Sequence, residues 1–361
     1  MGLKMQKRVI LTIVLCLLSV SGYANGLTKL KIMTYNVNGL PDIITKIKKY
    51  KSFESKKERL SNLCAFLKEK NANTESMIDA VMLQEVWLKK DQKILAQTSG
   101  YAYACYKDDK SFQSGLVILS NNPITNCHKN IFQDRTPDSG PGSIIDKKIK
   151  RAYLEATITL QNGQEFVLTN THLISNYKPE PEDKPDNKFK FKPDSSESVR
   201  LSQLNEIFTD LASVDKPIII GGDLNTGPEY PLWDKLSGDN GLAADHGYLF
   251  DNNNEATFSN TNIYVIKSEG SLDHFLANQY VEIKNSTVLS KETMKTVNSN
   301  ILEVAQNGDS FKELTSEILE VAELLDNNLP ETITLVDSSD HYAKIIDVEI
   351  CCDPEKSIAA S

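Results

Sequence analysis

Short apolar segments of strand length recur along the whole sequence, and they limit the chain to a fold that contains many strands. Residues 30–37 alternate apolar and polar side chains, as a half-buried strand does. Six further segments have the apolar composition of buried strands: residues 80–83, 116–119, 152–160, 165–171, 217–220 and 345–350. Residues 56–70 and 200–211 carry apolar side chains at three- and four-residue spacings, which predicts two amphipathic helices. The sequence therefore predicts a mixed α/β fold.

The composition is that of a globular protein with an acidic balance. The 361 residues include 49 acidic and 40 basic side chains, a formal net charge of −9, and 40% of them are hydrophobic. These values exclude a disordered chain, a collagen-like fibre and a multi-span membrane protein. The acidic balance argues against a protein that coats nucleic acid, but it allows an enzyme that handles phosphates through a metal ion.

The first 24 residues have the pattern of a secretory signal peptide. Three basic residues precede an apolar run at residues 9–20, and Gly22 and Ala24 fit the −3 and −1 positions of a cleavage site. The alternative is a membrane anchor, but the run is too short to cross a bilayer comfortably. We expect cleavage near Ala24, a single domain at residues 25–361, and a secreted or periplasmic location.

The cysteines indicate a disulfide rather than a zinc site. Five remain after the signal peptide, and none forms a CxxC pair: Cys64, Cys105, Cys127, Cys351 and Cys352. Export would allow one disulfide, with Cys105 and Cys127 as a candidate pair. The odd count leaves at least one thiol unpaired within the chain, and the sequence does not fix the connectivity.

Polar residues follow several of the predicted strands. Asn36 ends the first strand, Glu85 follows the second, and His172 ends a later one. Three further motifs complete the set: GGDLN at residues 221–225, SLDH at 271–274 and SSDH at 338–341. Catalytic side chains often lie at strand ends, where the scaffold fixes them and the loop exposes them. Each motif alone also has a structural interpretation: Asn36 as a turn former, GGDLN as a strand-to-turn switch, and His172 as a hydrogen-bonded core residue.

Together and in this order, the six motifs resemble the endonuclease/exonuclease/phosphatase superfamily of metal-dependent phosphoesterases. The resemblance runs from about residue 30 to residue 350. Within the superfamily, secreted bacterial neutral sphingomyelinases look most similar, because they share the export signal, the GGDLN element and a terminal SDHY. The resemblance implies a four-layer α/β sandwich, in which two mostly antiparallel sheets are flanked by helices and the site lies at one end.

The resemblance also implies a metal centre. A phosphodiester is anionic and resists nucleophiles, so a hard divalent cation is needed to neutralise the charge that develops. The resemblance makes Glu85 the principal ligand of Mg²⁺, with Mn²⁺ as an alternative. It places Asn36 beside Glu85, on the metal or the phosphate, and Asp340 in the polar or metal shell.

The remaining motif residues take catalytic roles by the same resemblance. His341 would be the general base that deprotonates water, because imidazole has a suitable intrinsic pKa. Asp273 would orient and stabilise its imidazolium form. Asp223 and Asn225 would position the water and the phosphate, and His172 would donate to a non-bridging oxygen.

Other polar residues rank below this set. Arg200 and Gln203 lie one helical turn apart and are candidates to brace the site. The basic pair Lys150–Arg151 precedes a strand and is expected to be solvated, although it could approach a phosphate. His274 is interpreted as a packing residue.

The chain departs from the best-known sphingomyelinases in two places. Residues 86–89 and 111–114 lack the ligands of a second, peripheral metal site. A predicted helix at residues 309–327, within a helical insertion at about residues 290–330, replaces the aromatic hairpin that docks those enzymes on membranes. The Lys- and Phe-alternating stretch at residues 188–192, within a polar loop, is either a lipid-contacting segment or an ordinary solvated loop.

These observations favour a secreted Mg²⁺-dependent phosphodiesterase that cleaves sphingomyelin or a related phospholipid, with a phospholipid membrane surface as its partner. The alternative is a secreted nuclease of the same superfamily, which would bind nucleic acid instead. An inactive homologue is disfavoured because all seven core residues of the set are present, and an inositol-phosphate phosphatase would need a basic pocket that the sequence does not reveal. The sequence indicates no obligate protein partner.

Overall fold

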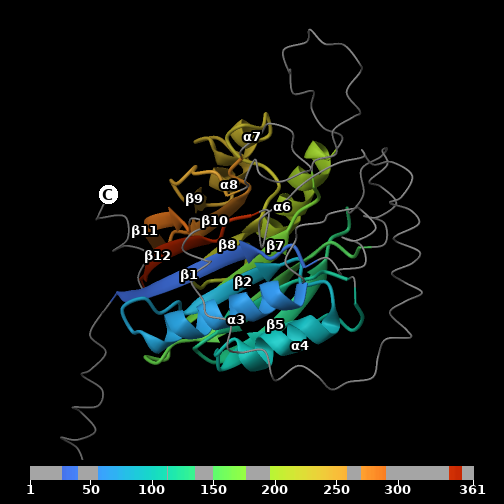
Figure 1. Cartoon of the computed structure of the whole chain (residues 1–361). Coiled ribbons are helices and arrows are strands. Elements are labelled where there is room, and N and C mark those ends of the chain that lie inside the picture. Colours follow the sequence, from blue (N-terminus) through green and yellow to red (C-terminus); the bar gives the residue numbers. More distant parts are fainter. Residues whose placement is uncertain are drawn as a thin grey trace, which may run out of the picture.

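The structure is a computed structural model of the whole chain (Figure 1). It describes residues 27–39, 56–111, 113–134, 149–175, 196–257, 270–289 and 341–351. Several predictions fall outside these residues: the signal peptide at 1–24, the loop segment at 188–192, the helix at 309–327, and Asp340. Among the described residues, no helix is long and apolar enough to cross a membrane.

One sheet has six strands in the order β11-β12-β1-β2-β4-β3. The neighbours β1 and β2 are parallel, and every other pair is antiparallel. The strands are β1 (Thr28–Asn36), β2 (Ala80–Gln84), β3 (Tyr103–Cys105), β4 (Val117–Ser120), β11 (Val281–Val288) and β12 (Lys344–Ile350). Strands β1 to β4 lie in the first third of the chain, whereas β11 and β12 come from its last third and pair with each other, with β12 beside β1.

A second sheet has six strands in the order β5-β6-β7-β8-β10-β9, with one parallel pair, β7 and β8. Its strands are β5 (Ile124–Ile131), β6 (Ala152–Thr159), β7 (Glu165–His172), β8 (Ile218–Asp223), β9 (Tyr248–Phe250) and β10 (Asp273–Asn278). The other pairs are antiparallel. Both sheets are therefore mostly antiparallel, as predicted.

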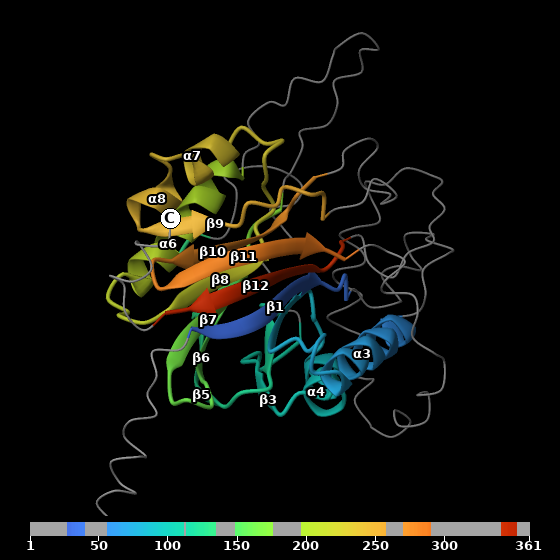
Figure 2. The ribbon, with the colours of Figure 1, turned by 90° about the vertical axis from the view of Figure 1, so that its left-hand side faces the viewer.

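Helices cover the outer face of each sheet, which gives four layers (Figure 2). The first sheet is covered by α3 (Lys56–Ala72) and α4 (Lys89–Thr98), whose apolar residues form one core cluster with β1, β2 and β4. The second sheet is covered by α6 (Glu197–Leu211), with the short α7 (Trp233–Ser237) and α8 (Leu242–Asp245) beside it. The predicted α/β sandwich is confirmed.

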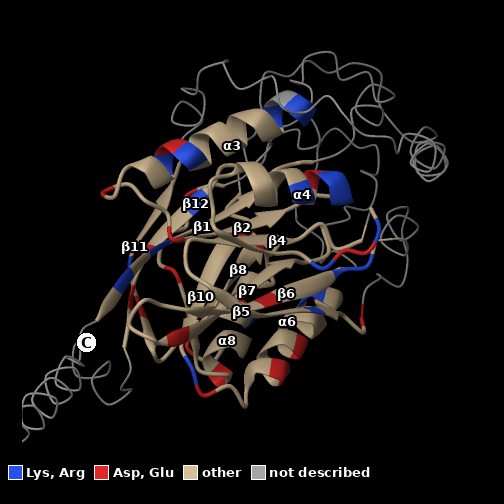
Figure 3. Cartoon of the chain, turned by 90° about the horizontal axis from the view of Figure 1, so that it is seen from below, with Lys and Arg blue, Asp and Glu red and all other residues tan. Residues whose placement is uncertain are grey.

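The central core lies between the two sheets and is formed by alternate residues of their strands. In β2, Ala80 and Met82 face the other sheet, while Val81 and Leu83 face the helices. Because both faces of this strand are covered, its sequence is a continuous apolar run. Strands β2 and β4 accordingly carry no charged residue, whereas α3, α4 and α6 carry many (Figure 3).

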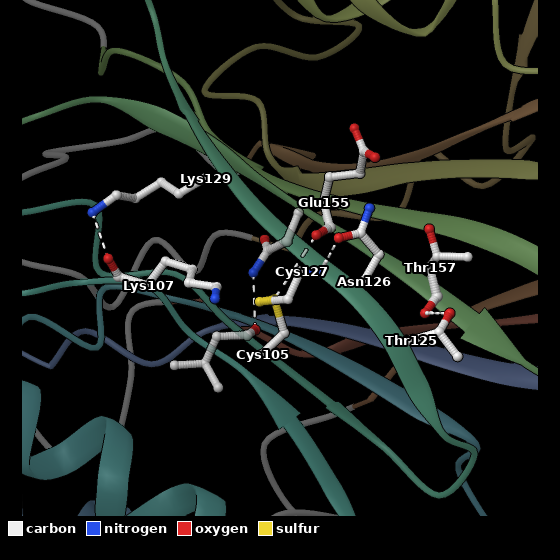
Figure 4. Close-up of a disulfide and its surroundings, with 10 residues drawn as sticks. Cys105, Lys107, Thr125, Asn126, Cys127, Lys129, Glu155 and Thr157 are labelled. Carbon is white, nitrogen blue, oxygen red and sulfur yellow. Dashed lines mark hydrogen bonds between the residues drawn. A yellow bond between two sulfur atoms is a disulfide. The ribbon is translucent and has the colours of Figure 1, made fainter.

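The candidate disulfide joins the edges of the two sheets. Cys105 ends β3, an edge strand of the first sheet, and Cys127 lies in β5, an edge strand of the second. The two cysteines are bonded, with a Cα–Cα distance of 5.8 Å (Figure 4). The predicted pairing is confirmed, and Cys64 is not part of a disulfide.

Candidate active site

The sheet topology brings the predicted polar residues to one end of the sandwich. In the first sheet, β1 and β2 are parallel, so that Asn36 pairs with Gln84 and Glu85 follows directly. The antiparallel strand β12 begins near the end of β1, which places His341 at this same end. In the second sheet, Asp223 at the end of β8 pairs with His172 of β7 and with Asp273 at the start of β10.

His341 and Asp273 form a hydrogen-bonded pair across the two sheets. The imidazole Nδ1 lies 2.7 Å from Asp273 Oδ2, and both side chains are buried. Because an ionised carboxylate only accepts hydrogen bonds, Nδ1 donates, and Nε2 of the neutral ring is the proton acceptor. Asp273 therefore fixes the tautomer that a general base requires.

Asp223 lies at the centre of the site. Its Oδ2 is 3.7 Å from His341 Nε2, 3.4 Å from His172 Nε2 and 2.9 Å from Asn36 Nδ2, while its Oδ1 accepts the Asn225 backbone N–H at 2.9 Å. Burial raises the pKa of Asp223 to about 7. The charge of His341 opposes this rise in pKa, and the Asp273 carboxylate adds to it. A cation beside this carboxyl would favour its ionised form, because an opposite charge offsets the loss of solvent.

Asn36 joins this centre to Glu85. Its Nδ2 donates to Glu85 Oε1 at 3.1 Å as well as to Asp223, and its Oδ1 accepts the Asn38 backbone N–H at 3.0 Å. Glu85 is half-buried, and Trp87 Nε1 donates to its other oxygen at 3.3 Å. Two carboxylates thus converge on one amide group.

His172 is neutral in this environment. Burial, followed by the nearby charges of Arg151 and His341, holds its pKa well below the ordinary value. Its ring lies 6.1 Å, between centroids, from that of Trp87. A neutral imidazole has one N–H to donate, which suits the predicted role of a donor to phosphate oxygen.

Backbone strain is concentrated at this end of the sandwich. Among the described residues, three non-glycine residues have positive φ: Asn38 at 43°, Glu85 at 61° and Asn225 at 51°. Two are predicted site residues, and Asn38 binds a third, Asn36. Strained non-glycine conformations cost free energy and cluster at functional sites. The strain therefore supports the predicted location independently of the motifs.

The donor set fits a hard divalent cation. One ligand atom from each of Asp223, Asp273 and His341 lies within 4.8 Å of the others. Since Asp273 is engaged by His341, the oxygen donors better suited to a metal are those of Glu85 and Asp223, with the Asn36 amide between them. Asp340, the other predicted ligand, lies outside the described residues.

Two of the lower-ranked residues support the segment that follows His172. Gln203 Oε1 accepts the Ile174 N–H at 3.1 Å and Arg200 donates to the Ile174 carbonyl at 3.2 Å, so both brace the chain just after His172. The expectation of a solvated Arg151 is wrong, because this side chain is buried and donates to the His172 carbonyl at 3.4 Å. Its guanidinium reaches the end of β7, a contact that the sequence pattern did not reveal. His274 is a packing residue, as predicted, with its ring 4.4 Å from that of Trp233.

Sequence reasoning missed three residues that form hydrogen bonds to the site residues. Trp87 donates to the Glu85 carboxylate, the Thr257 hydroxyl accepts the Asp273 N–H, and Lys344 donates to the Asp273 carbonyl. Trp87 follows Glu85 by two positions, and this proximity was the available signal. Thr257 is 16 residues from Asp273 and Lys344 is 71 residues from it, so only the fold brings these contacts together.

Comparison with known proteins assigns this architecture to a family. The model of the Endonuclease/Exonuclease/phosphatase family matches residues 33–341, so the chain belongs to this family. Members of the family are hydrolases that act on phosphodiester bonds and typically depend on divalent metals. No curated protein matches the chain by sequence.

Solved structures share the fold at low sequence identity. Humanized TDP2 from D. rerio is 15% identical with a TM-score of 0.54, and the match covers 89% of this chain and 98% of that one. Beta toxin from Staphylococcus aureus is 14% identical with a TM-score of 0.53, covering 88% and 99%. Sphingomyelinase C from Streptomyces griseocarneus is 15% identical with a TM-score of 0.52, covering 89% and 99%.

Proposed function

We propose that this protein is a secreted Mg²⁺-dependent phosphodiesterase that hydrolyses sphingomyelin or a related phospholipid to ceramide or diacylglycerol and phosphocholine. The observation that carries the proposal is the position of His341 between two carboxylates, 2.7 Å from Asp273 on one side and 3.7 Å from Asp223 on the other. Both carboxylates lie where they would stabilise the positive charge that the imidazole acquires during proton transfer from water. The imidazole is therefore equipped to deprotonate a water molecule.

The surrounding residues complete the reaction. His341 Nε2 takes the proton of the attacking water, and Asp273 stabilises the charge that results. The water oxygen bonds to phosphorus as the bond from phosphorus to the lipid oxygen breaks, and the departing lipid alkoxide takes up a proton from solvent. His172, kept neutral by burial, donates from Nε2 to a non-bridging phosphate oxygen. Asn225 helps to place Asp223 through its backbone N–H. A divalent cation would be held by Glu85, with Asn36, Asp223 and Asp340 as further oxygen donors, and would neutralise phosphate charge. Mg²⁺ is the expected ion, and Mn²⁺ is the alternative.

The lipid substrate is supported by sequence resemblance and by charge. Sphingomyelinase C is among the structural neighbours, and the net charge of −9 disfavours extended contacts to a nucleic-acid backbone. The alternative, a secreted endonuclease, has its own support, because D. rerio TDP2 in complex with a single-strand DNA product also shares the fold, with a TM-score of 0.51. The phospholipid membrane surface, or nucleic acid under the alternative, is the partner that follows.

A location outside the cytoplasm belongs to the same proposal. Signal-peptide cleavage near Ala24 would release a single domain, residues 25–361, to the periplasm or the medium. The Cys105–Cys127 bond supports this location, because disulfides persist in oxidising compartments.

The test compares two substrates with one purified protein, residues 25–361. Sphingomyelin liposomes and plasmid DNA are each incubated with Mg²⁺, Mn²⁺ or EDTA. We expect metal-dependent release of phosphocholine and an intact plasmid. His341→Asn should reduce turnover by at least about a hundredfold because the general base is lost, while His128→Asn, an exposed residue of β5, should not change it.

Nicked plasmid with untouched liposomes would establish the nuclease instead. Activity of His341→Asn within a factor of about ten of wild type would refute the role of His341 as the base.

A further inference from the structure

A buried lysine occupies a position of β12 where the fold otherwise places apolar residues. Alternate residues of β12 face the other sheet, and Ile346, Val348 and Ile350 belong to the central core. Lys344 takes the first of these inward positions, and its side chain has 0% exposure. A charge at such a position is costly unless it is paired and fully hydrogen-bonded.

Lys344 is fully hydrogen-bonded by three acceptors. Its Nζ lies 2.6 Å from Asp251 Oδ2, 2.6 Å from the Asn253 carbonyl and 3.2 Å from the Asp273 carbonyl. An ammonium group has three N–H donors, so each donor has one acceptor. The third acceptor is the main chain of the residue that orients His341.

Asp251 extends this contact to both sheets. Its Oδ1 accepts the Phe275 N–H of β10 at 3.0 Å, and its Oδ2 accepts the Ser286 hydroxyl of β11 at 2.7 Å. The carboxylate is fully buried, like the lysine. One ion pair thus connects β10 of the second sheet with β11 and β12 of the first.

His274 does not neutralise Asp251. Burial, together with the positive charge of Lys344, lowers the pKa of His274 to about 4, so the ring is neutral near pH 7. Its Nε2 lies 2.8 Å from the Ser271 carbonyl and its Nδ1 is 3.9 Å from Asp251 Oδ1. Lys344 is therefore the cation that balances the buried carboxylate.

His341 is carried by the first sheet and Asp273 by the second, so their hydrogen bond depends on how the sheets are placed relative to each other. Lys344 is three residues from His341 along the chain and is hydrogen-bonded to Asp273. We infer that Lys344 and Asp251 are positioning residues, whose ion pair holds Asp273 against His341 and so sets the geometry of the general base.

A purely structural role predicts a different result. Replacing both members of a buried ion pair by uncharged residues of similar size is often neutral or stabilising. If the pair only filled space, Lys344→Met combined with Asp251→Asn would leave the site unchanged. If it positions Asp273, the same change would disturb the hydrogen bond between Asp273 and His341.

The test uses the double variant Lys344→Met/Asp251→Asn and two measurements. The first is the downfield proton resonance of the His341 Nδ1–H, identified by its loss in His341→Asn. It should be present in the wild type and shifted or absent in the double variant. The second is steady-state kinetics on whichever phosphodiester the wild type hydrolyses. We expect kcat to fall at least about tenfold with little change in KM, because misplacement of a catalytic group acts on the chemical step.

Ile350→Ala is the matched control. Ile350 is another buried, inward-facing residue of β12, at the end of the strand away from His341. This variant should lower the melting temperature but leave both the resonance and kcat at wild-type values. If Lys344→Met/Asp251→Asn fails to fold, Lys344→Gln/Asp251→Asn, which keeps an amide donor for the two carbonyls, is measured in its place.

A folded double variant with the wild-type resonance and wild-type kcat would overturn the inference. The kinetic measurement rests on the proposed function, whereas the resonance does not. A wild type without phosphodiesterase activity would therefore refute the proposed function, and the resonance alone would still decide the role of the ion pair.

Discussion

At the scale of single residues, the site separates two kinds of carboxylate. Asp273 makes a short hydrogen bond to His341, so it serves the proton-transfer group directly. Asp223 lies 3.4 and 3.7 Å from two imidazoles, and Asn36 connects it to Glu85. Similar side chains thus take different roles because their neighbours differ.

The raised pKa of Asp223 predicts how the metal-free protein responds to pH. Burial raises the pKa of this carboxyl from 3.8 to about 7, so the folded state holds its proton more tightly than the unfolded chain does. The stability from this group is fully present below pH 3.8 and is lost as the pH rises through about 7. In EDTA, Asp223→Asn should therefore melt at a higher temperature than wild type at pH 8, and the difference should shrink towards pH 4.

Thermal unfolding across this pH range checks the prediction, with the exposed Asp239→Asn as its control. A difference in melting temperature between Asp223→Asn and wild type that is constant with pH would contradict it. Excess Mg²⁺ should reduce the advantage of Asp223→Asn, because a bound cation stabilises the ionised carboxylate of the wild type.

At the scale of elements, the segment after β2 holds the predicted metal ligand in place. Trp87 donates to Glu85 Oε2, and its indole ring packs over Gly115, where an added Cβ would lie 2.9 Å from the ring. Position 39 likewise has space only for glycine, since a Cβ there would lie 2.2 Å from the Glu85 carbonyl oxygen. The position of Glu85 therefore depends on two neighbouring segments as well as on its own strand.

Trp87→Phe tests this support, because it removes the N–H donor and keeps an aromatic ring. Without the donor the Glu85 carboxylate is less well oriented, and we expect the Mg²⁺ concentration for half-maximal activity to rise about tenfold, as for the loss of a hydrogen-bond partner of a metal ligand. Metal titration of the activity measures this. Trp233→Phe, at the other tryptophan of the chain, should leave the titration unchanged, and an unchanged titration in Trp87→Phe would exclude the orienting role.

Most strands that could be predicted from the sequence lie inside the sheets, and most that could not be predicted lie at the edges. The predicted strands are present, as are the two of the three predicted helices that fall within the described residues, with ends displaced by a few residues. The four edge strands, β3, β5, β9 and β11, were not predicted. Edge strands are short or expose polar side chains, as in ITNCHKNI of β5, so apolar periodicity is weak there. The interior strand β10 was missed because its six residues begin with Asp273 and His274.

The residues of the candidate site also fall into a predicted group and a group that was not predicted. Residues at strand ends were predictable, because their motifs, taken in order, resemble those of a known family. Trp87, Thr257 and Lys344 act through contacts with other segments, and for Thr257 and Lys344 these contacts depend on tertiary packing that periodicity does not encode.

At the scale of the whole molecule, the site is divided between the two sheets. The first sheet supplies Asn36, Glu85 and His341, and the second supplies His172, Asp223 and Asp273. Neither sheet alone holds a base with its orienting carboxylate. Contacts that join the sheets therefore matter for chemistry as well as for stability.

The Cys105–Cys127 disulfide joins the two sheets covalently. It joins two edge strands and closes a segment with a sequence separation of 22 residues. Constraining the unfolded chain over a loop of this length stabilises the folded state by about 3 kcal/mol. Cys105→Ser/Cys127→Ser should therefore unfold at a lower urea concentration than wild type. Wild type treated with a reductant should approach the midpoint of the double variant, and the reductant should not shift the double variant itself. Equal midpoints for oxidised wild type and the double variant would show that packing between the sheets, rather than the covalent bond, holds the edges together.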